Sequence, residues 1–468
     1  MGSPPGNIKF FSQYAVRKEL FFAQRYHFIG IAGIGMSGLA RLLLQQGAQV
    51  SGSDRVSGLM TDALEKEGAK VFIGHSKEQV PPGATVIYSS DIPPDNVEWL
   101  EAQRLQLPLM HRSQLLAYLI KEKQAIAVAG SHGKTTTTAL LATLLIDAAW
   151  QPTYILGGLL KKQQTNGGYG VGQYAVFEAD ESDGTCLNYQ PFGAILTNID
   201  LEHMNHFGSE PALLATFQTF AHQVASPEHI LWCADDLRLK KLGLNGFSYG
   251  FDSSADLQIL DWEQRGWKTI LQISFQEEFY RDIEIPLIGR HNALNAAAVF
   301  GMGLLLSIPE KQIRDSFVQF KGVKRRCDFK GKINDALIID DYAHHPTEIK
   351  TTLEAIRRAV EGSRLIALFQ PHRYTRTRDC LGMYPGVFDA VDLLVITDIY
   401  AGGEPKLEEL SHEQVIADIR TQAAPPVRYI PRNELLTELS AFLQPGDILV
   451  TLGAGDITKV SEEIYSSK

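Results

Sequence analysis

The sequence has few cysteines and no closely spaced cysteine pair. Cys186, Cys233, Cys327 and Cys380 lie far apart in a chain of 468 residues, and no two of them form a C-x-x-C pair. Cysteine-based zinc sites and disulfide scaffolds both need closely spaced cysteines. We therefore predict four reduced thiols, in the core or at the surface.

Long apolar runs and an excess of positive charge are also missing. No run approaches the roughly eighteen apolar residues of a membrane span, and residues 1–7 lack the charged-then-apolar pattern of a signal peptide. The formal net charge of −10 and the pI near 5.7 argue against a nucleic-acid partner, since neutralising phosphates requires a basic face. We expect a cytoplasmic protein with no membrane span and no nucleic-acid partner.

The length indicates several domains, because 468 residues are too many for one ordinary core. Hydrophobic content of 44% and charged content of 21% are typical of a soluble globular protein. Strand-like runs alternate with helical patterns, which predicts an α/β fold. We place three domains at residues 1–123, 124–322 and 323–468: a Rossmann-like N-terminal domain, a central P-loop ATPase-like domain with a small antiparallel insertion, and a C-terminal doubly wound α/β domain.

A glycine loop lies between a strand-like run at residues 125–128 and a helical run at residues 137–146. It reads Gly130-Ser131-His132-Gly133-Lys134-Thr135, a shortened phosphate loop. In such a loop, backbone N–H groups surround a polyphosphate, the lysine reaches the outer phosphates and the hydroxyl binds Mg²⁺. The structural alternative is a glycine turn capped by Ser131, with Lys134 only solvated.

A second glycine loop lies near the N-terminus. Gly33-Ile34-Gly35-Met36-Ser37-Gly38 follows apolar residues 27–31 and precedes a helical run at 39–44, and the next strand ends at Asp54. This G-x-G-x-x-G arrangement places a diphosphate at a helix N-terminus, with the acidic residue near a sugar or base. We predict diphosphate binding, with an NAD site as the alternative interpretation.

Carboxylates and a histidine follow later strands of the central domain. Glu178 begins an acidic cluster directly after the strand-like residues 174–177, and His203 follows the strand-like residues 194–197. Ligands of open parallel sheets bind where the strands end, and carboxylate oxygen suits Mg²⁺. We predict Glu178 and His203 as metal ligands. Solvated carboxylates and a packed histidine are the structural alternatives.

The end of the central domain carries two further signals. Residues 245–286 are rich in strands and turns and predict the antiparallel insertion. Asn292 and Asn295 share one face near the start of the following helix, where their amides can bond an adenine edge; helix capping by Asn292 is the alternative. Three consecutive cations at residues 324–326 then suit a nucleotide phosphate.

Two strand ends of the third domain are rich in histidine and arginine. Residues 336–340 lead into Asp341-Tyr342-Ala343-His344-His345, and residues 365–369 lead into a segment that contains Arg373 and Arg376. Solvated loop charge is the simple explanation. Because both ends lie on one predicted sheet edge, we expect them to converge on an anionic substrate.

Together these motifs resemble the Mur ligases, ATP-dependent amide-forming enzymes of peptidoglycan precursor synthesis. The resemblance covers about residues 27–460 and rests on eight segments in order: HFIGIAGIGMSGLA (27–40), GSHGKTTTT (130–138), EADESD (178–183), GRHNALNAAA (289–298), DDYAHHPTEI (340–349), FQPHRYTRT (369–377), YAGGEP (400–405) and GAGDI (453–457). It is strongest to the member that joins L-alanine to the lactyl carboxylate of UDP-N-acetylmuramate. That carboxylate would attack the γ-phosphate of ATP, and the alanine amine would attack the resulting acyl phosphate.

The resemblance also implies roles for individual residues. The ATP contacts would be Gly130, Ser131, His132, Gly133, Lys134, Thr135, Thr136, His291, Asn292, Asn295, Arg326 and Asp341. Two Mg²⁺ ions, which Mn²⁺ can replace, would be held by Thr135, Glu178 and His203. The UDP end would be held by Gly33, Ile34, Gly35, Met36, Ser37, Gly38 and Asp54. The muramyl carboxylate and alanine would meet Tyr342, His344, Arg373 and Arg376. The catalytic residues would be Lys134, Glu178, His203, His344 and Arg326.

Several alternatives stay open. Within the family, a recycling ligase adds a whole tripeptide to the same UDP-sugar; outside it, an NAD-dependent dehydrogenase and a non-catalytic nucleotide switch are the other candidates. A monomer and a weak dimer are both compatible with the sequence, as is tolerance of serine or glycine in place of alanine. Several Mur ligases use a carbamylated lysine shortly after the metal-binding histidine, but residues 210–225 contain no lysine. The support that this lysine provides must therefore be replaced or absent here, which leaves the composition of the second metal shell open.

Overall fold

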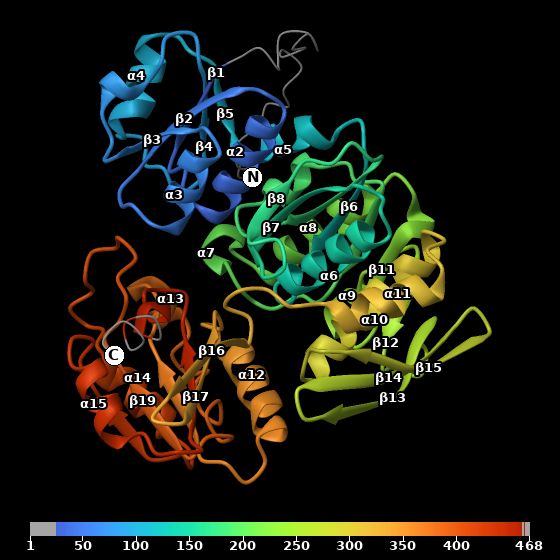
Figure 1. Cartoon of the computed structure of the whole chain (residues 1–468), viewed down its shortest axis with the longest axis vertical. Coiled ribbons are helices and arrows are strands. Elements are labelled where there is room, and N and C mark those ends of the chain that lie inside the picture. Colours follow the sequence, from blue (N-terminus) through green and yellow to red (C-terminus); the bar gives the residue numbers. More distant parts are fainter. Residues whose placement is uncertain (1–24, 461–462, 464–468) are drawn as a thin grey trace, which may run out of the picture. The chain divides into compact units, whose positions relative to one another are not determined.

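The computed structural model describes residues 25–460 and 463. The chain divides into two compact units, one comprising residues up to 119 together with 167–169 and the other comprising the rest (Figure 1). The expectation for residues 1–7 lies outside the described residues, and the three domain boundaries stay predictions.

The first unit is built on a parallel sheet with the strand order β3-β2-β1-β4-β5. Its strands are β1 (Arg25–Ile29), β2 (Gln49–Asp54), β3 (Lys70–Ile73), β4 (Thr85–Tyr88) and β5 (Leu109–His111). Its helices are α2 (Ile34–Gln45), α3 (Leu59–Lys66), α4 (Val97–Arg104) and α5 (Arg112–Ile120). Residues 26–29 are fully buried, as a central parallel strand covered on both faces requires. The strand order reverses beside β1, which confirms the Rossmann-like prediction.

The second unit begins with a ten-stranded sheet in the order β15-β14-β13-β12-β11-β10-β6-β9-β7-β8. Its strands are β6 (Gln124–Ala129), β7 (Thr153–Leu160), β8 (Thr165–Gly168), β9 (Tyr174–Ala179), β10 (Gly193–Leu196), β11 (Ile230–Cys233), β12 (Phe247–Gly250), β13 (Leu257–Arg265), β14 (Lys268–Phe275) and β15 (Glu278–Ile285). Its helices are α6 (Lys134–Asp147), α7 (Met204–Phe207), α8 (Glu210–His222), α9 (Leu237–Lys241), α10 (Arg290–Leu305) and α11 (Glu310–Gln319). Helix α6 packs against β6, β9 and α10.

The predicted antiparallel insertion is only partly separate from this sheet. Strands β13, β14 and β15 pair antiparallel, as predicted. However, β12 pairs parallel with both β11 and β13, so the antiparallel strands continue the main sheet instead of forming their own. The prediction that the whole of 245–286 is antiparallel was therefore wrong for β12.

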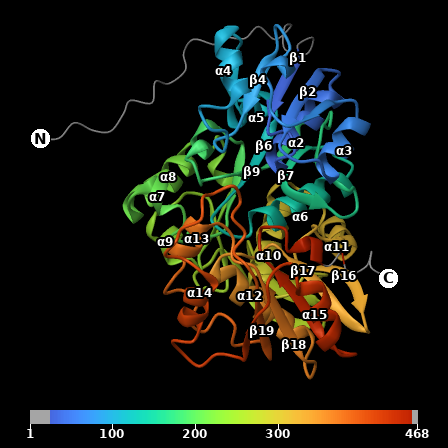
Figure 2. The same ribbon diagram turned by 90° about the vertical axis from the view of Figure 1, so that its left-hand side faces the viewer.

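The third domain has a six-stranded sheet in the order β16-β17-β21-β18-β19-β20. Its strands are β16 (Asp328–Ile333), β17 (Ala336–Asp341), β18 (Leu365–Phe369), β19 (Leu393–Ile396), β20 (Val427–Tyr429) and β21 (Ile448–Leu452), and its helices are α12 (Pro346–Ala359), α13 (Tyr374–Asp379), α14 (His412–Ile419) and α15 (Leu435–Phe442). Figure 2 shows this alternation in the orange and red part of the chain.

Two separate hydrophobic clusters cover the two faces of the third sheet. Ile339 and Phe369 pack in one cluster with residues of α12 and α14, whereas Ile338 and Leu368 pack in the other with residues of α15. Neighbouring residues of a strand point to opposite faces, so helices must cover both sides. This confirms the doubly wound prediction. The antiparallel edge strand β16 was not predicted.

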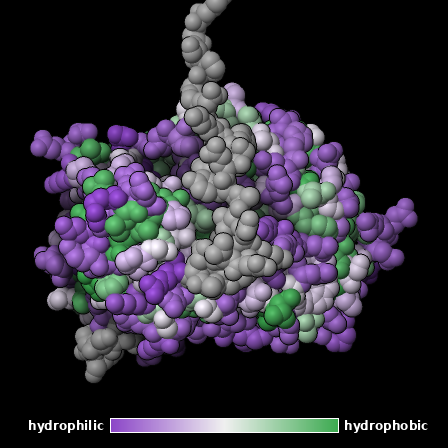
Figure 3. Space-filling model, turned by 90° about the horizontal axis from the view of Figure 1, so that it is seen from above, coloured by the Kyte–Doolittle hydropathy of each residue, from purple (hydrophilic) through white to green (hydrophobic). Residues whose placement is uncertain are grey.

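The surface of the molecule is mostly polar. On the face drawn in Figure 3, hydrophilic residues predominate and apolar residues form small groups. Among the described residues, no helix has both the length and the apolar character that crossing a membrane requires. All four cysteines are free thiols, as predicted.

Candidate active site

Three loops leave the same edge of the ten-stranded sheet. Strand β6 pairs in parallel with β9 on one side and β10 on the other. The phosphate loop follows β6, the acidic cluster follows β9, and His203 lies in the segment after β10. Parallel pairing therefore brings the predicted phosphate-loop and metal-binding segments to one edge, as the sequence indicated.

The phosphate loop ends where helix α6 begins. Gly133 is the N-cap and has a left-handed φ of 84°. A Cβ at Gly133 would lie 2.8 Å from Oδ1 of Asn295, so only glycine fits there without a shift. The same contact places the amide of Asn295, which lies on α10, directly against the phosphate loop.

Lys134 lies in a pocket of oxygen atoms. Its Nζ donates to Glu181 Oε2 at 2.8 Å and to the carbonyl oxygen of Ser131 at 3.2 Å. Burial alone would lower the pKa of Lys134, but the charges of Glu181 and Asp180 outweigh burial and raise it above the usual value. The side chain is therefore a fixed positive charge at the loop, and the solvated-lysine alternative is not what the structure shows.

Thr135 and Glu178 form a pair of oxygen donors beside that charge. The hydroxyl of Thr135 donates to Glu178 Oε2 at 3.0 Å, and Glu178 Oε1 accepts from the backbone N–H of Gly157. A Cβ at Gly157 would lie 2.8 Å from Glu178 Oε2, and one at Gly158 would lie 2.6 Å from Val323 Cγ1. Burial raises the pKa of Glu178, while Gly157 and Lys134 oppose that shift. A hydroxyl and a partly buried carboxylate fit a hard divalent cation.

His203 lies in a strained position at the start of α7. It is the N-cap residue and has a left-handed φ of 56°. Its Nε2 lies 3.6 Å from Glu202 Oε2. Burial lowers the pKa of His203 to about 4, Asp180 opposes this shift, and Arg376 and Lys134 add to it. The neutral imidazole is the form that binds a metal.

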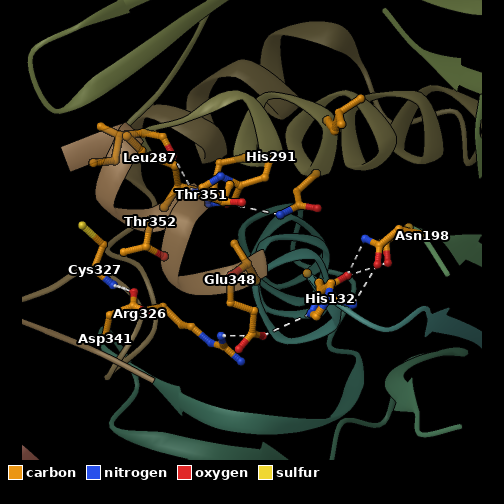
Figure 4. Close-up of a pocket in the computed structure, with 18 of the residues that line it drawn as sticks. His132, Asn198, Leu287, His291, Arg326, Cys327, Asp341, Glu348, Thr351 and Thr352 are labelled. Carbon is orange, nitrogen blue, oxygen red and sulfur yellow. Dashed lines mark hydrogen bonds and ion pairs between the residues drawn. The ribbon is translucent and has the colours of Figure 1, made fainter. Parts of the chain in front are cut away.

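A cavity of about 440 Å³ opens next to the phosphate loop. Figure 4 shows His132, His291, Arg326, Asp341 and Glu348 in its lining. Apolar side chains complete the wall, namely Trp267, Leu287, Ile288 and Phe329. Both the central and the third domain thus contribute to a cavity of the size that holds a small ligand.

The predicted adenine residues lie in this wall. Asn292 Nδ2 donates to the carbonyl oxygen of Ile288 at 2.8 Å, and Asn295 Nδ2 donates to Asn292 Oδ1 at 3.2 Å. The N-cap of α10 is Gly289, so Asn292 does not cap the helix. His291 Nδ1 is buried and has no hydrogen-bond partner among the described residues. Burial lowers the pKa of His291 to about 4, so a neutral ring with one unmatched nitrogen lines the cavity.

Asp341 holds the segment that follows the domain boundary. Its carboxylate accepts from the backbone N–H of Cys327 at 2.7 Å and of Ala343 at 2.8 Å. Burial raises the pKa of Asp341 to about 6, although Arg326 opposes the shift. Asp341 therefore positions the backbone around Arg326 in addition to lining the cavity.

The two charged strand ends of the third domain meet. The rings of His344 and His372 have centroids 6.1 Å apart, and Arg376 Nη1 lies 3.0 Å from His372 Nδ1. His344 Nδ1 lies 3.0 Å from the carbonyl oxygen of Tyr342. Arg373 is the N-cap residue of α13, and its backbone N–H donates to the carbonyl oxygen of Tyr400 at 2.7 Å. The structure thus brings together the segments that were expected to converge.

In the first unit, the glycine loop joins β1 to α2. Helix α2 begins at Ile34, and the Asp54 carboxylate accepts from the backbone N–H of Ala32 at 2.9 Å. Asp54 therefore fixes the loop, a role that was not predicted. The guanidinium of Arg112 lies 3.7 Å from where a Cβ at Gly35 would stand.

Three family models match the chain in order. They describe the catalytic domain of the Mur ligase family over residues 25–124, the Mur ligase middle domain over residues 128–303 and the glutamate ligase domain over residues 325–455. The chain belongs to the Mur ligase family.

Individual relatives of this Mur ligase agree with that result. A UDP-N-acetylmuramate–L-alanine ligase of Protochlamydia amoebophila is 50% identical over 94% of this chain and 97% of its own length. The crystal structure of a UDP-N-acetylmuramate–alanine ligase from Thermotoga maritima is 26% identical and superimposes with a TM-score of 0.83, covering 95% of this chain and 100% of that one. A murein peptide ligase from Psychrobacter arcticus, at 22% identity and a TM-score of 0.72 over 95% of this chain and 98% of that one, shares the fold.

Some residues of this Mur ligase site were not singled out from the sequence. They are Glu181, Asp200, Glu202, His345 and Glu348. Glu348 lies between His132 Nδ1, at 3.4 Å, and Arg326 Nη1, at 3.9 Å (Figure 4). The available signal was its place in the first turn of α12, behind Pro346. Nothing local in the sequence indicates its contact with the phosphate loop.

Proposed function

We propose that the chain is an ATP-dependent ligase that joins L-alanine to the lactyl carboxylate of UDP-N-acetylmuramate, releasing ADP and phosphate, in the synthesis of peptidoglycan precursors. The observation that carries this proposal is the sheet edge where Lys134 meets Glu181 and Thr135 meets Glu178 beside a cavity of about 440 Å³. The 50% identical relative is a UDP-N-acetylmuramate–L-alanine ligase, and the match covers 97% of its length, which supports the choice of substrates.

The nucleotide would occupy the cavity and the phosphate loop. Its adenine would lie near His291, Asn292 and Asn295, whose polar atoms include the unmatched Nδ1 of His291. Its phosphates would face Lys134 and the N-terminus of α6. Phosphoryl transfer depends on positioning and on neutralising charge, which Lys134 and Arg326 supply from two sides.

Magnesium fits the oxygen donors at the same edge. Thr135 and Glu178 would hold one ion, and the neutral His203 would serve a second one. Bound there, the metal would neutralise charge on the phosphates. The chain's own residues prepare that place: Gly157 orients Glu178 through its N–H, and burial keeps His203 unprotonated.

The carboxylate and the incoming amine would be handled by the third domain. Arg373 and Arg376 would bind the anionic groups, and Tyr342 and His344 would border them. The lactyl carboxylate then forms a bond to the γ-phosphorus as ADP leaves, and the alanine nitrogen displaces phosphate from the acyl phosphate. The loop at 33–38 in the first unit would hold the diphosphate of the UDP-sugar. Because ATP and UDP-sugars are cytoplasmic metabolites, we place the reaction in the cytoplasm.

A phosphate-release assay tests this function. The chain is supplied with ATP, Mg²⁺ and UDP-N-acetylmuramate, and each amino acid is added in turn, with the murein tripeptide as a further arm. We expect release with L-alanine above all others. Release with the tripeptide alone would identify the recycling ligase, and release that needs no acceptor would contradict ligation. A change in nicotinamide absorbance with NAD would instead reveal a dehydrogenase.

A further inference from the structure

Four side chains outside the proposed magnesium ligands converge on one point. His132 comes from the phosphate loop, Asp200 and Glu202 come from the segment after β10, and His345 precedes α12 in the third domain. Each offers one ligand atom, and these four atoms all lie within 4.8 Å of one another. Thr135, Glu178 and His203 are not part of this cluster.

The distances between the ligand atoms fit a tetrahedral metal centre. His132 Nε2 lies 3.0 Å from Asp200 Oδ2 and 3.5 Å from Glu202 Oε1. His345 Nδ1 lies 3.8 Å from Asp200 Oδ2 and 3.4 Å from Glu202 Oε1. A tetrahedron with metal–ligand bonds of about 2.1 Å has edges of about 3.4 Å. Four of the six edges therefore scatter around the length that such a centre needs, and the other two are no longer than 4.8 Å.

Neighbouring groups orient two of the ligands. The Nδ1 of His132 faces Glu348 Oε1 at 3.4 Å, which directs its Nε2 toward the cluster (Figure 4). A histidine bound to a carboxylate through one nitrogen and to a metal through the other is a common arrangement. The Asp200 carboxylate is held from both sides, since Oδ1 accepts from the N–H of Leu201 at 2.9 Å and Oδ2 accepts from the Thr347 hydroxyl at 3.0 Å.

Glu202 gives an independent indication of a missing partner. Its Oε1 is buried and has no hydrogen bond among the described residues, although it lies between two imidazole nitrogens. A buried carboxylate oxygen without a hydrogen bond is costly, and a cation at the centre of the cluster would satisfy it.

We propose that His132, Asp200, Glu202 and His345 form a four-coordinate site for a divalent transition metal of the zinc class, distinct from the magnesium ions of the reaction. Two imidazoles and two carboxylates suit Zn²⁺ or Co²⁺, whereas Mg²⁺ prefers six oxygen ligands. The two carboxylates also balance the charge of the ion. His132 and Asp200 also line the nucleotide cavity, but the site can be tested apart from the proposed function, because cobalt binding is read in the absence of nucleotide.

Such a metal would connect two domains of the second unit. Three ligands belong to the central domain and His345 to the third, directly before Thr347 and Glu348, which line the nucleotide cavity. The ion would hold the start of α12 against the phosphate loop. The segment that meets the nucleotide would then be fixed before any nucleotide binds.

Cobalt spectroscopy on the full chain tests the site without using activity. The protein is stripped with a chelator, kept free of nucleotide and titrated with Co²⁺. We expect one Co²⁺ per chain with the intense visible absorption of four-coordinate cobalt, displaced by stoichiometric Zn²⁺. His345→Ala and the near-isosteric Glu202→Gln should each weaken Co²⁺ binding by at least about 100-fold, since even outer partners of a metal contribute 10- to 100-fold.

Two matched variants separate this site from its surroundings. His203→Ala removes the proposed magnesium ligand beside Glu202, and His229→Ala removes a histidine elsewhere in the central domain; both should keep the cobalt spectrum. Circular dichroism shows that each variant is folded. The proposal is overturned if the wild-type chain gives only the weak spectrum of six-coordinate cobalt, as an ion-pair network alone predicts. It is equally overturned if the bands survive in Glu202→Gln or disappear in His203→Ala.

Discussion

Two loops of this chain share one backbone plan but carry different side chains. Both follow a central parallel strand and lead into a helix, β1 to α2 in the first unit and β6 to α6 in the second. In the first loop, the anchoring group is Asp54, which accepts a backbone N–H. In the second, Lys134 and Thr135 reach the carboxylates of Glu181 and Glu178.

The different side chains of the two loops suit two different tasks, binding a phosphate in the first loop and transferring one in the second. Helix N-termini bind phosphates in either case, because free N–H groups and the helix dipole favour negative charge. Transfer requires in addition a fixed cation and metal ligands at the point where charge moves. The phosphate loop of the second unit has the fixed cation Lys134 and lies beside the proposed metal ligands Thr135 and Glu178, whereas the Gly33–Gly38 segment contains no charged residue. We therefore expect substitutions in the two loops to have different kinetic signatures.

The largest effect should come from Lys134→Ala. Loss of one charge from the transferring phosphoryl group costs at least several kcal/mol of transition-state stabilisation, so kcat should fall by about 1000-fold or more. Phosphate release measures the loss, and thermal unfolding shows whether the fold is intact. Lys162→Ala, which removes the partner of Asp147 at a half-exposed site, is the matched control. Near-wild-type turnover of Lys134→Ala would refute the role of this loop.

Glu178→Gln should have the next largest effect. The amide oxygen can still accept from Gly157, but the charge that draws a divalent cation is gone, so turnover should fall by about 100-fold and need more Mg²⁺. The measurement is turnover against Mg²⁺ concentration. Glu228→Gln, at an exposed turn, should leave the curve unchanged. An unaltered Mg²⁺ requirement in Glu178→Gln would remove Glu178 from the metal site.

Arg376→Ala tests the charged strand end of the third domain, which lies outside both glycine loops. Loss of a charged hydrogen bond to an anionic substrate costs about 2 kcal/mol, so the apparent KM for alanine or for the UDP-sugar should rise by about 30-fold, and that for ATP much less. Steady-state kinetics with each substrate varied give the comparison, with Arg378→Ala as the neighbouring control. A selective loss of ATP affinity would count against the assignment of this strand end.

Asp54→Asn should have the smallest effect and the most selective one. The loop keeps an acceptor for Ala32 but loses the charged one, at a cost of about 1 kcal/mol. The KM for the UDP-sugar should therefore rise by about five-fold while the KM for ATP stays constant. Asp62→Asn, on the exposed side of α3, is the control. If ATP kinetics change instead, the two loops do not divide the substrates as proposed.

The sequence was informative wherever the chemistry is local. Strand, loop and helix follow one another within a few residues in both glycine segments, and the structure has this order. The helices begin earlier than predicted, α2 at Ile34 instead of residue 39 and α6 at Lys134 instead of residue 137. Short apolar runs that alternate with helical segments likewise identified the parallel strands of the third domain. Strand β16 was missed because DFKGKI carries three charged residues and only two hydrophobic ones, and because it pairs only at a sheet edge with a bulge.

Contacts between distant segments could not be read from the sequence. Glu348 and His345 belong to α12 and its cap, yet they lie against His132 in the phosphate loop. That contact depends on the strand registers of two sheets and on the segment that connects the two domains. The periodicity of apolar residues in the sequence contains no information about either. Asp54 shows the same limit on a smaller scale, because an acidic residue at a strand end fits a sugar contact or a loop anchor equally well.

The two adjacent glycines of β7 limit which substitutions this protein can tolerate. Gly157 and Gly158 leave no room for a Cβ against Glu178 and Val323, so a randomised library at these two positions should return glycine at both under selection for growth. A ligand that contacts β7 at these two residues would meet only main-chain atoms of the strand. Resistance would then have to arise elsewhere, because no substitution there could repel the compound without also displacing the carboxylate.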